Sequence, residues 1–321
     1  MRIVFMGSSA ASATCLQAIL REKSLEVVGL VTQPDKPAGR GKEVTPCACK
    51  AYAVKRGITN VITPLNVNDP EPMAQIAAWK PDAVVVVAYG QFLKEPLLNL
   101  PKYGCINCHF SLLPKYRGAS PVVACLEHGD MRTGVTVMKM GIGMDDGPIL
   151  MQSYEPVYPD TTGGALMDDL AIAGGVTLAK CLKQMEAGIL PPPMAQNNDD
   201  ATYTHKLKKT DGLINWDEPV LVIERKIRAY YPWPGCYSFV GGKRLGILKA
   251  SFADANLLHL STSTWPNQKP GTVLAITKKG FVVKAHDTSL LITEVKPEGK
   301  NAMPASAFLN GRKLSVGDML S

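Results

Sequence analysis

The sequence predicts an α/β protein: a Rossmann-like, doubly wound, mostly parallel sheet, followed by a smaller C-terminal β-barrel of the OB-like kind. Two observations predict the sheet. The chain opens with an apolar strand at residues 2–6, a helical stretch to residue 21 and a second strand at 25–32, which together make a βαβ unit. Residues 81–89 (PDAVVVVAY) then form an uninterrupted apolar run, typical of a strand covered on both faces.

A change of composition predicts the second domain. Residues 188–201 contain three consecutive prolines and then a polar run, which is typical of a linker. From residue 236 onward, short apolar runs alternate with Gly or Lys turns, which favours a small barrel of the type often used to hold oligonucleotides. We therefore expect a catalytic domain at 1–188, a linker at 189–204 and a second domain at 205–321.

Composition narrows the class of protein. The length of 321 residues exceeds one average domain, and the hydrophobic content of 46% is ordinary for a soluble chain. The N-terminal apolar run is too short for a signal peptide, and no run approaches membrane-spanning length, so we expect a cytoplasmic protein without membrane partners whose eight cysteines are free thiols. The net charge of +7 is compatible with a polyanionic partner, and surface solubility explains it about equally well.

Residues 104–121 (GCINCHFSLLPKYRGASP) carry the candidate chemistry. Asn107 and His109 alternate at the end of a short strand, so their side chains point to the same side. The same letters spell CxxCH, the signature of haem attachment. Haem attachment needs an exported chain and an exposed loop, whereas Cys105 lies in an apolar strand, and a redox CxxC needs a helix N-terminus. Both of these interpretations are therefore disfavoured.

The residue types suit acyl transfer. Asn107 offers an amide donor, His109 an imidazole, and Asp145 or Asp146 in a glycine-rich loop a carboxylate. A lone histidine is as often structural as catalytic, but two polar groups on one face at the carboxyl end of a parallel strand favour a site. There is no GxSxG elbow, no GxGxxG dinucleotide fingerprint and no His/Cys spacing for a metal, so we expect none of these chemistries.

Residues 33–42 (QPDKPAGRGK) form a basic loop rich in Pro and Gly, which we expect to be irregular. It carries Lys36, Arg40 and Lys42 against Asp35 alone. One interpretation is a solvated surface loop. The other is an arm that meets phosphates and becomes ordered on contact.

These motifs resemble a known family. INCHFSLLPKYRGASP is similar to the hallmark of folate-dependent formyltransferases, in which Asn-x-His precedes SLLP. GVTVMKMGIGMDDGPIL resembles the segment that supplies the family's catalytic Asp before a Gly. The resemblance continues through VVVVAYG, QPDKPAGRGK, THKLKK, IRAYYPWPG and KPEGKNAM, and so covers nearly the whole chain.

The resemblance implies transfer of a formyl group from 10-formyltetrahydrofolate to the α-amine of methionyl initiator tRNA, by a monomer that needs no metal. It implies a catalytic set of Asn107, His109 and Asp145, with spacing to Gly147 favouring Asp145 over Asp146. The folate site implied is bordered by Ser111, Leu112, Leu113, Pro114, Tyr89 and Gln91. The tRNA contacts implied are Lys36, Arg40 and Lys42 on the acceptor arm and Lys206 and Lys208 on the stem.

Three alternatives stay open at this point. A sugar-amine formyltransferase or a 10-formyltetrahydrofolate hydrolase would share the catalytic set, and the basic residues are what favour tRNA. A purine-pathway formyltransferase is usually a single domain, so the C-terminal domain argues against it. A non-catalytic RNA-binding protein would explain the basic barrel and not the Asn/His/Asp set.

Overall fold

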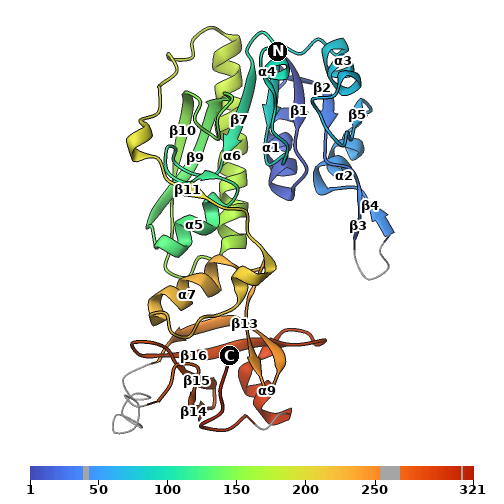
Figure 1. Ribbon diagram of the computed structural model, residues 1–321. Helices are drawn as coiled ribbons and strands as arrows, with labels where there is room; N and C mark the ends of the chain where they lie inside the picture. Colours follow the sequence, from blue (N-terminus) through green and yellow to red (C-terminus); the bar gives the residue numbers. More distant parts are fainter. Residues whose placement is uncertain (39–42, 254–267, 312–313) are drawn as a thin grey trace. The chain divides into compact units, whose positions relative to one another are not determined.

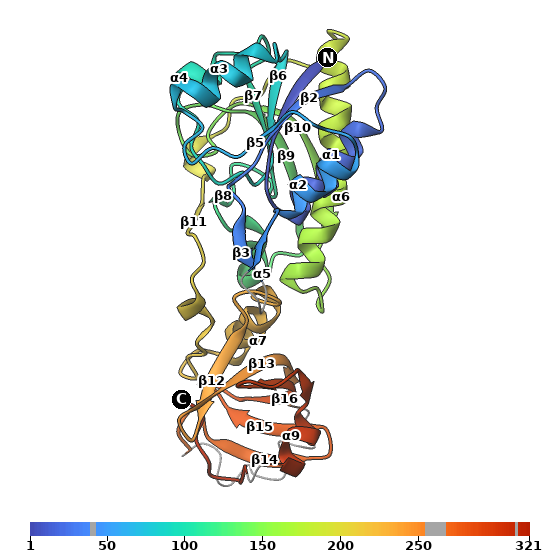
Figure 2. The same ribbon diagram turned by 90° about the vertical axis from the view of Figure 1, so that its right-hand side faces the viewer.

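The computed structural model describes residues 1–38, 43–253, 268–311 and 314–321, and these form two compact units (Figures 1 and 2). The first unit consists of Met1–Pro121, Met131–Val157 and Leu166–His205. The second consists of Val122–Asp130, Tyr158–Ala165 and Lys206–Ser321.

The first unit is built on a seven-stranded sheet of order β5-β2-β1-β6-β7-β9-β10. The five strands from β5 to β7 are parallel, and β9 and β10 are antiparallel to their neighbours. The strands are β1 (Arg2–Met6), β2 (Glu26–Val31), β5 (Val61–Ile62), β6 (Ala83–Val86), β7 (Cys105–His109), β9 (Arg132–Lys139) and β10 (Ile149–Pro156). The predicted mostly parallel sheet is confirmed.

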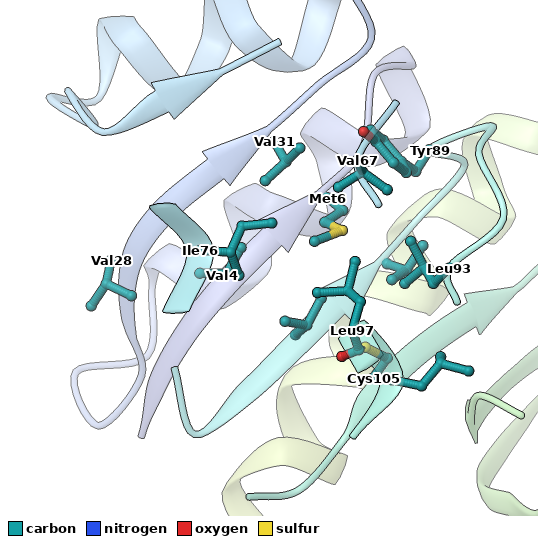
Figure 3. Close-up of a cluster of buried hydrophobic side chains, with 13 residues drawn as sticks. Val4, Met6, Val28, Val31, Val67, Ile76, Tyr89, Leu93, Leu97 and Cys105 are labelled. Atoms are coloured by element: carbon teal, nitrogen blue, oxygen red, sulfur yellow. The ribbon is translucent and has the colours of Figure 1, made fainter. Parts of the chain in front are cut away.

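Helices cover both faces of this sheet: α1 (Ala10–Leu20), α2 (Ala48–Lys55), α3 (Pro70–Ala78), α4 (Glu95–Leu98) and α6 (Gly163–Glu186). On one face Val4, Met6 and Cys105 form a core cluster with Ile76 of α3 and Leu97 of α4 (Figure 3). Among the residues that the structure describes, no helix combines the length and apolar character that a membrane crossing needs.

On the opposite face, α6 packs closely because it carries adjacent glycines. A Cβ on Gly174 would lie 2.9 Å from Cys108 Sγ of β7, and one on Gly175 would lie 2.9 Å from the Ala18 side chain of α1. Because side chains alternate along β7, Cys108 packs beneath α6 while Asn107 and His109 project to the other side.

Two short stretches differ from the expected elements. Strand β6 stops at Val86, before residue 89, and Ala88 adopts a φ of 45°, so the chain turns there. The basic loop is not wholly irregular, because β3 (Lys36–Ala38) pairs with β4 (Glu43–Thr45) as an antiparallel hairpin. The expectation of an irregular loop is wrong for the hairpin stem, and residues 39–42 lie outside the described residues.

The segment expected to be a linker forms hydrogen bonds within the first unit. Met194 exchanges backbone hydrogen bonds with Ile149 of β10, both at 2.8 Å. A short 3-10 helix, η1 (Asn198–Asp200), follows, and β11 (Tyr203–Thr204) then pairs in parallel with β8 (Arg117–Gly118). These contacts bring residues 194–204 beside the end of β7 rather than leaving them free.

The second unit contains an antiparallel sheet of order β12-β13-β16-β15-β14, with β17 paired to β16, so antiparallel β-structure is confirmed there. Among the residues that the structure describes in this unit, the ladder does not close continuously into a barrel; its two edges are joined by isolated bridges from Leu320 to Val240 and from Met319 to Thr272. The strands are β12 (Cys236–Val240), β13 (Lys243–Phe252), β14 (Val273–Thr277), β15 (Gly280–Lys284), β16 (Ser289–Pro297) and β17 (Met303–Pro304). The helices are α5 (Pro121–His128), η2 (Lys209–Gly212), α7 (Val220–Ala229) and α9 (Ala305–Gly311).

Candidate active site

Three polar side chains meet where β7 ends. Asn107 Nδ2 lies 3.4 Å from Asp145 Oδ1, and His109 Nδ1 lies 3.6 Å from Asp145 Oδ2. Strand β7 supplies the first two residues, and the loop after β9 supplies the third. The carboxyl end of the parallel strands is where open α/β sheets place their ligands. The structure therefore brings together the three residues that the sequence selects.

The imidazole of His109 is held on both sides. The side chain is only 6% exposed, and Nε2 lies 2.9 Å from the backbone oxygen of Tyr116. A carbonyl oxygen can only accept, so Nε2 carries a proton and Nδ1 faces the carboxylate of Asp145. This contact fixes both the orientation of the ring and which nitrogen meets Asp145.

Asp145 is fixed by its own backbone and by a glycine. Its φ of 49° is in the left-handed region, which Asp adopts more readily than most residues. The Gly118 amide donates to Asp145 Oδ2 at 2.8 Å. Gly118 itself has a φ of 107°, and a Cβ there would lie 2.6 Å from Thr204 O. The close approach of β8 to the carboxylate therefore depends on this glycine.

The neighbouring carboxylate points elsewhere. Asp146 is exposed, and its carboxylate occupies the space that a Cβ on Gly143 would take. It closes over the glycine-rich loop instead of turning to His109. The geometry thus favours Asp145, as the spacing to Gly147 does.

The loop after β7 is tied to the sheet. Ser111 is buried and donates from its hydroxyl to Lys115 O at 2.6 Å, and Leu113 is buried and donates its amide to Thr136 Oγ1 at 3.1 Å. Leu112 and Pro114 are partly exposed. Of the four residues of this loop that are proposed to border the folate, only Leu112 and Pro114 present side chains at the surface.

Tyr89 and Gln91 follow β6 and play different parts. Tyr89 is 2% exposed, burial raises the pKa of its hydroxyl, and this hydroxyl has no hydrogen-bond partner within the described residues. The Gln91 amide instead holds a neighbouring loop: it accepts from Val67 N at 2.8 Å and donates to Pro64 O at 3.1 Å.

The cysteines of the CxxCH letters are structural. Cys105 is fully buried and Cys108 is 2% exposed, and burial raises the pKa of the Cys105 thiol to about 12. All eight cysteines are free, as expected. Within the described ranges, no group of three or more His, Cys, Asp or Glu could hold a metal ion.

The basic residues proposed to meet tRNA are unequally placed. Lys36, Lys206 and Lys208 are exposed, whereas Arg40 and Lys42 lie outside the described residues. Two of the three cations of α7 are paired with carboxylates, since Lys226 contacts Glu218 at 2.6 Å and Arg228 contacts Glu224 at 2.6 Å, while Arg225 donates to the His128 backbone oxygen at 3.1 Å. The positive charge of α7 therefore serves local structure, although the sequence shows it as a basic stretch.

Two residues next to the site, Arg117 and Gln196, were not predicted from the sequence. Arg117 is 2% exposed and donates to Gln196 Oε1, and Gln196 Nε2 donates to the backbone oxygens of Asp145 at 2.8 Å and Gly147 at 2.7 Å. Arg117 lies within the motif at residues 104–121, so its position in the sequence could have indicated a role near the site. Gln196 lies in a polar run that carries no motif.

Comparisons with known proteins identify the family of this chain. Residues 1–182 match the formyl transferase family, and residues 206–313 match the formyl transferase C-terminal domain. A methionyl-tRNA formyltransferase of Pseudomonas entomophila (strain L48) is 41% identical over 98% of this chain and 96% of its own. The chain belongs to the methionyl-tRNA formyltransferase family. A second member, from Geotalea daltonii, is 39% identical over 100% of this chain and 98% of its own.

Solved structures share the fold of this formyltransferase family member. The methionyl-tRNA formyltransferase from Clostridium thermocellum matches with a TM-score of 0.55 and 15% identity, over 79% of this chain and 94% of that one. HypX from Aquifex aeolicus in complex with tetrahydrofolic acid matches with a TM-score of 0.64 and 17% identity, over 99% of this chain. The same match covers 50% of the HypX chain.

Proposed function

We propose that this protein transfers the formyl group of 10-formyltetrahydrofolate to the α-amino group of methionyl initiator tRNA, giving N-formylmethionyl-tRNA for translation initiation. The observation that carries the proposal is the meeting of Asn107, His109 and Asp145 at the end of β7. Support comes from full-length relatives named methionyl-tRNA formyltransferase at about 40% identity. We further propose a cytoplasmic monomer whose partners are this tRNA and the folate.

Asn107 and His109 act on the oxygen of the formyl group. When an amine attacks a formyl carbon, negative charge develops on that oxygen and needs donors. The Asn107 amide has two N–H groups, and its contact with Asp145 uses one at most, so the other can donate to the oxyanion. Because His109 Nε2 donates to Tyr116 O, only a proton on Nδ1, the nitrogen that faces Asp145, can support the same charge.

Asp145 orients the imidazole and balances positive charge on it. A free α-amine ordinarily has a pKa of about 8, so part of it is already neutral at neutral pH and needs little activation to attack. Asp145 is the carboxylate placed to help the proton move from the amine towards N10 of the folate, as the new bond to the formyl carbon forms and the bond from that carbon to N10 breaks. No covalent enzyme intermediate is required.

Bound 10-formyltetrahydrofolate supplies the formyl group. Leu112 and Pro114 offer partly exposed apolar surface to its ring system, with Ser111 and Leu113 setting the course of the loop beneath them. Tyr89 is proposed to border the same site, although its hydroxyl, which has no hydrogen-bond partner among the described residues, is buried and presents no surface to a ligand in this structure. Gln91 contributes indirectly, by holding residues 64–67 beside this pocket wall.

The tRNA contacts proposed are electrostatic. Lys36 on β3, with Arg40 and Lys42 beyond it, offers positive charge to the acceptor arm, and Lys206 and Lys208 offer it to the stem. Lysines and arginines that neutralise phosphates give affinity that falls with salt and carries little base specificity. This fits an enzyme whose chemistry is directed at the aminoacyl end.

A comparison of acceptor substrates in separate reactions tests the proposal. The protein is incubated with 10-formyltetrahydrofolate and either methionyl initiator tRNA, a nucleotide-linked amino sugar or no acceptor. We expect formylated methionine with the first and no product with the second. Formylated sugar would indicate a sugar-amine formyltransferase, and formate released without acceptor would indicate a hydrolase. RNA binding without any turnover would leave only a binding protein.

A further inference from the structure

Arg117 and Gln196 form a chain of hydrogen bonds that ends on the backbone of Asp145. The Arg117 guanidinium donates to Gln196 Oε1 from Nε at 3.1 Å and from Nη2 at 2.8 Å. Gln196 Nε2 donates to Asp145 O at 2.8 Å and to Gly147 O at 2.7 Å. Because a guanidinium only donates and carbonyls only accept, the orientation of the Gln196 amide is fixed by its partners.

We propose that Gln196, held by Arg117, is a positioning residue that sets the conformation of the Asp145 loop and so the placement of Asp145 against His109. This inference rests on the proposed function for its kinetic consequence. Its structural content is independent of that function. It assigns a role near the catalytic groups to a segment that the sequence presents as a linker.

The loop needs an external hold because Asp145 has a φ of 49°, a conformation that non-glycine residues seldom adopt without support. One NH₂ group spans the turn, since it binds the carbonyls of residues 145 and 147. With both carbonyls fixed, the side chain of Asp145 is directed at His109 and at the Gly118 amide.

Arg117 is suited to anchor this arrangement because it is buried and its acceptors come from residues 196–203. Besides Gln196, its guanidinium donates to Asn198 Oδ1 at 2.9 Å and to Tyr203 Oη at 3.3 Å. A buried guanidinium without partners would be very costly, so these residues are held firmly to it. The adjacent backbone groups touch the reacting pair directly: Tyr116 O meets His109, and Gly118 N meets Asp145.

The test uses Gln196→Glu, which keeps an acceptor for Arg117 and loses both donors to the loop. We expect kcat with methionyl initiator tRNA to fall roughly tenfold to a hundredfold, as for a small misplacement of a catalytic group, while KM for both substrates changes less than about twofold. The Gly118 amide should exchange with solvent about tenfold faster by NMR, since its acceptor moves. Gln75→Glu, the same change at an exposed glutamine of α3, is the matched control and should leave all values unchanged.

Gln196→Ala removes the side chain without adding charge and covers the case in which the glutamate variant does not fold. Unchanged Gly118 exchange in a folded Gln196 variant would overturn the proposal, as would a change in KM with kcat intact. If the wild-type protein forms no formylated tRNA, the proposed function fails. The exchange measurement then still decides whether Gln196 positions the loop, because it needs no substrate.

Discussion

Asp145 faces His109 across 3.6 Å from a backbone turn in the left-handed region, with φ of 49°. The pair is therefore set by the loop after β9 as much as by strand β7. The Asp145 carboxylate has few alternative positions, because the turn, the Gly118 amide and the His109 ring constrain it together.

Asp145→Asn should reduce kcat roughly a hundredfold or more, because a neutral amide no longer orients and balances the imidazole. Asp146→Asn is the matched control, as that carboxylate lies over Gly143 and is exposed. Single-turnover formylation under saturating substrates separates the two. Equal losses in both variants would contradict the assignment of Asp145.

Asn107→Ala and His109→Ala should each lower kcat on the order of 100- to 1,000-fold by removing support for the oxyanion. The affinity for tRNA should stay near that of the wild type, measured by filter binding at fixed salt. His286→Ala, an exposed histidine of the second unit, serves as control. A parallel loss of tRNA affinity would place these residues in binding rather than chemistry.

Gly118→Ala should impair both stability and turnover. A Cβ there would lie 2.6 Å from Thr204 O, so β8 and β11 must separate and the Gly118 amide moves away from Asp145. Gly57→Ala isolates the backbone component, because Gly57 has a φ of 86° with open space around it. We expect Gly57→Ala to lower the free energy of unfolding by about 1–2 kcal/mol without loss of kcat. Gly118→Ala should lower the free energy of unfolding by more than this and should also reduce kcat.

Lys36→Ala, Lys206→Ala and Lys208→Ala should each weaken tRNA binding and lower the slope of log affinity against log salt by about 0.7–0.9, with kcat at saturation unchanged. Arg40→Ala, outside the described residues, is expected to behave alike. Lys183→Ala is the control, because Lys183 lies on α6 and its Nζ is 2.7 Å from the carboxylate of Glu22. A salt slope identical to that of the wild type in all four variants would exclude phosphate contacts there.

Buried thiols predict a loss of stability at alkaline pH. Burial raises the pKa of Cys105, Cys181 and Cys236 from 9.0 to about 12. Between these values the unfolded chain releases protons that the folded chain keeps, so the free energy of unfolding falls by about 1.4 kcal/mol per pH unit for each thiol as pH rises above about 9. Urea unfolding from about pH 8 to about pH 11 measures the slope, and Cys181→Ala should make it shallower. A slope unaffected by that substitution would contradict the prediction.

The central strands and the placement of Asn107 beside His109 were predictable because local signals determine them. Continuous apolar runs predict β1, β2 and β6, and alternation at the end of β7 places Asn107 and His109 on one side. Strand β10 was harder, because it lies at the edge of the sheet and its sequence, ILMQSYEP, is only partly buried. Hairpin β3–β4 was missed because Pro and Gly outweigh strand signals in so short an element.

The support around Asp145 was not predictable from local pattern. Gln196 reaches Asp145 through tertiary hydrogen bonds, and nothing in the polar run around Gln196 announces a partner. The same limit applies to the charges of α7, where Lys226 and Arg228 are paired with Glu218 and Glu224 although composition shows only a basic stretch. The sequence shows which residue types are present, whereas the hydrogen-bond and ion-pair partners of each residue depend on the tertiary fold.

The pairing of β11 with β8 bears on how such proteins can exchange parts during evolution. If two related proteins recombined at the three prolines, residues 191–193, the first unit would keep its own Arg117 and Gly118. The residues that contact them, at position 196 and positions 202–204, would come from the other protein. A joint after His205 keeps these partners together. For these contacts the seam therefore lies beyond the stretch whose composition suggests the boundary, but the same joint separates Val122–Asp130 and Tyr158–Ala165 from the rest of the second unit.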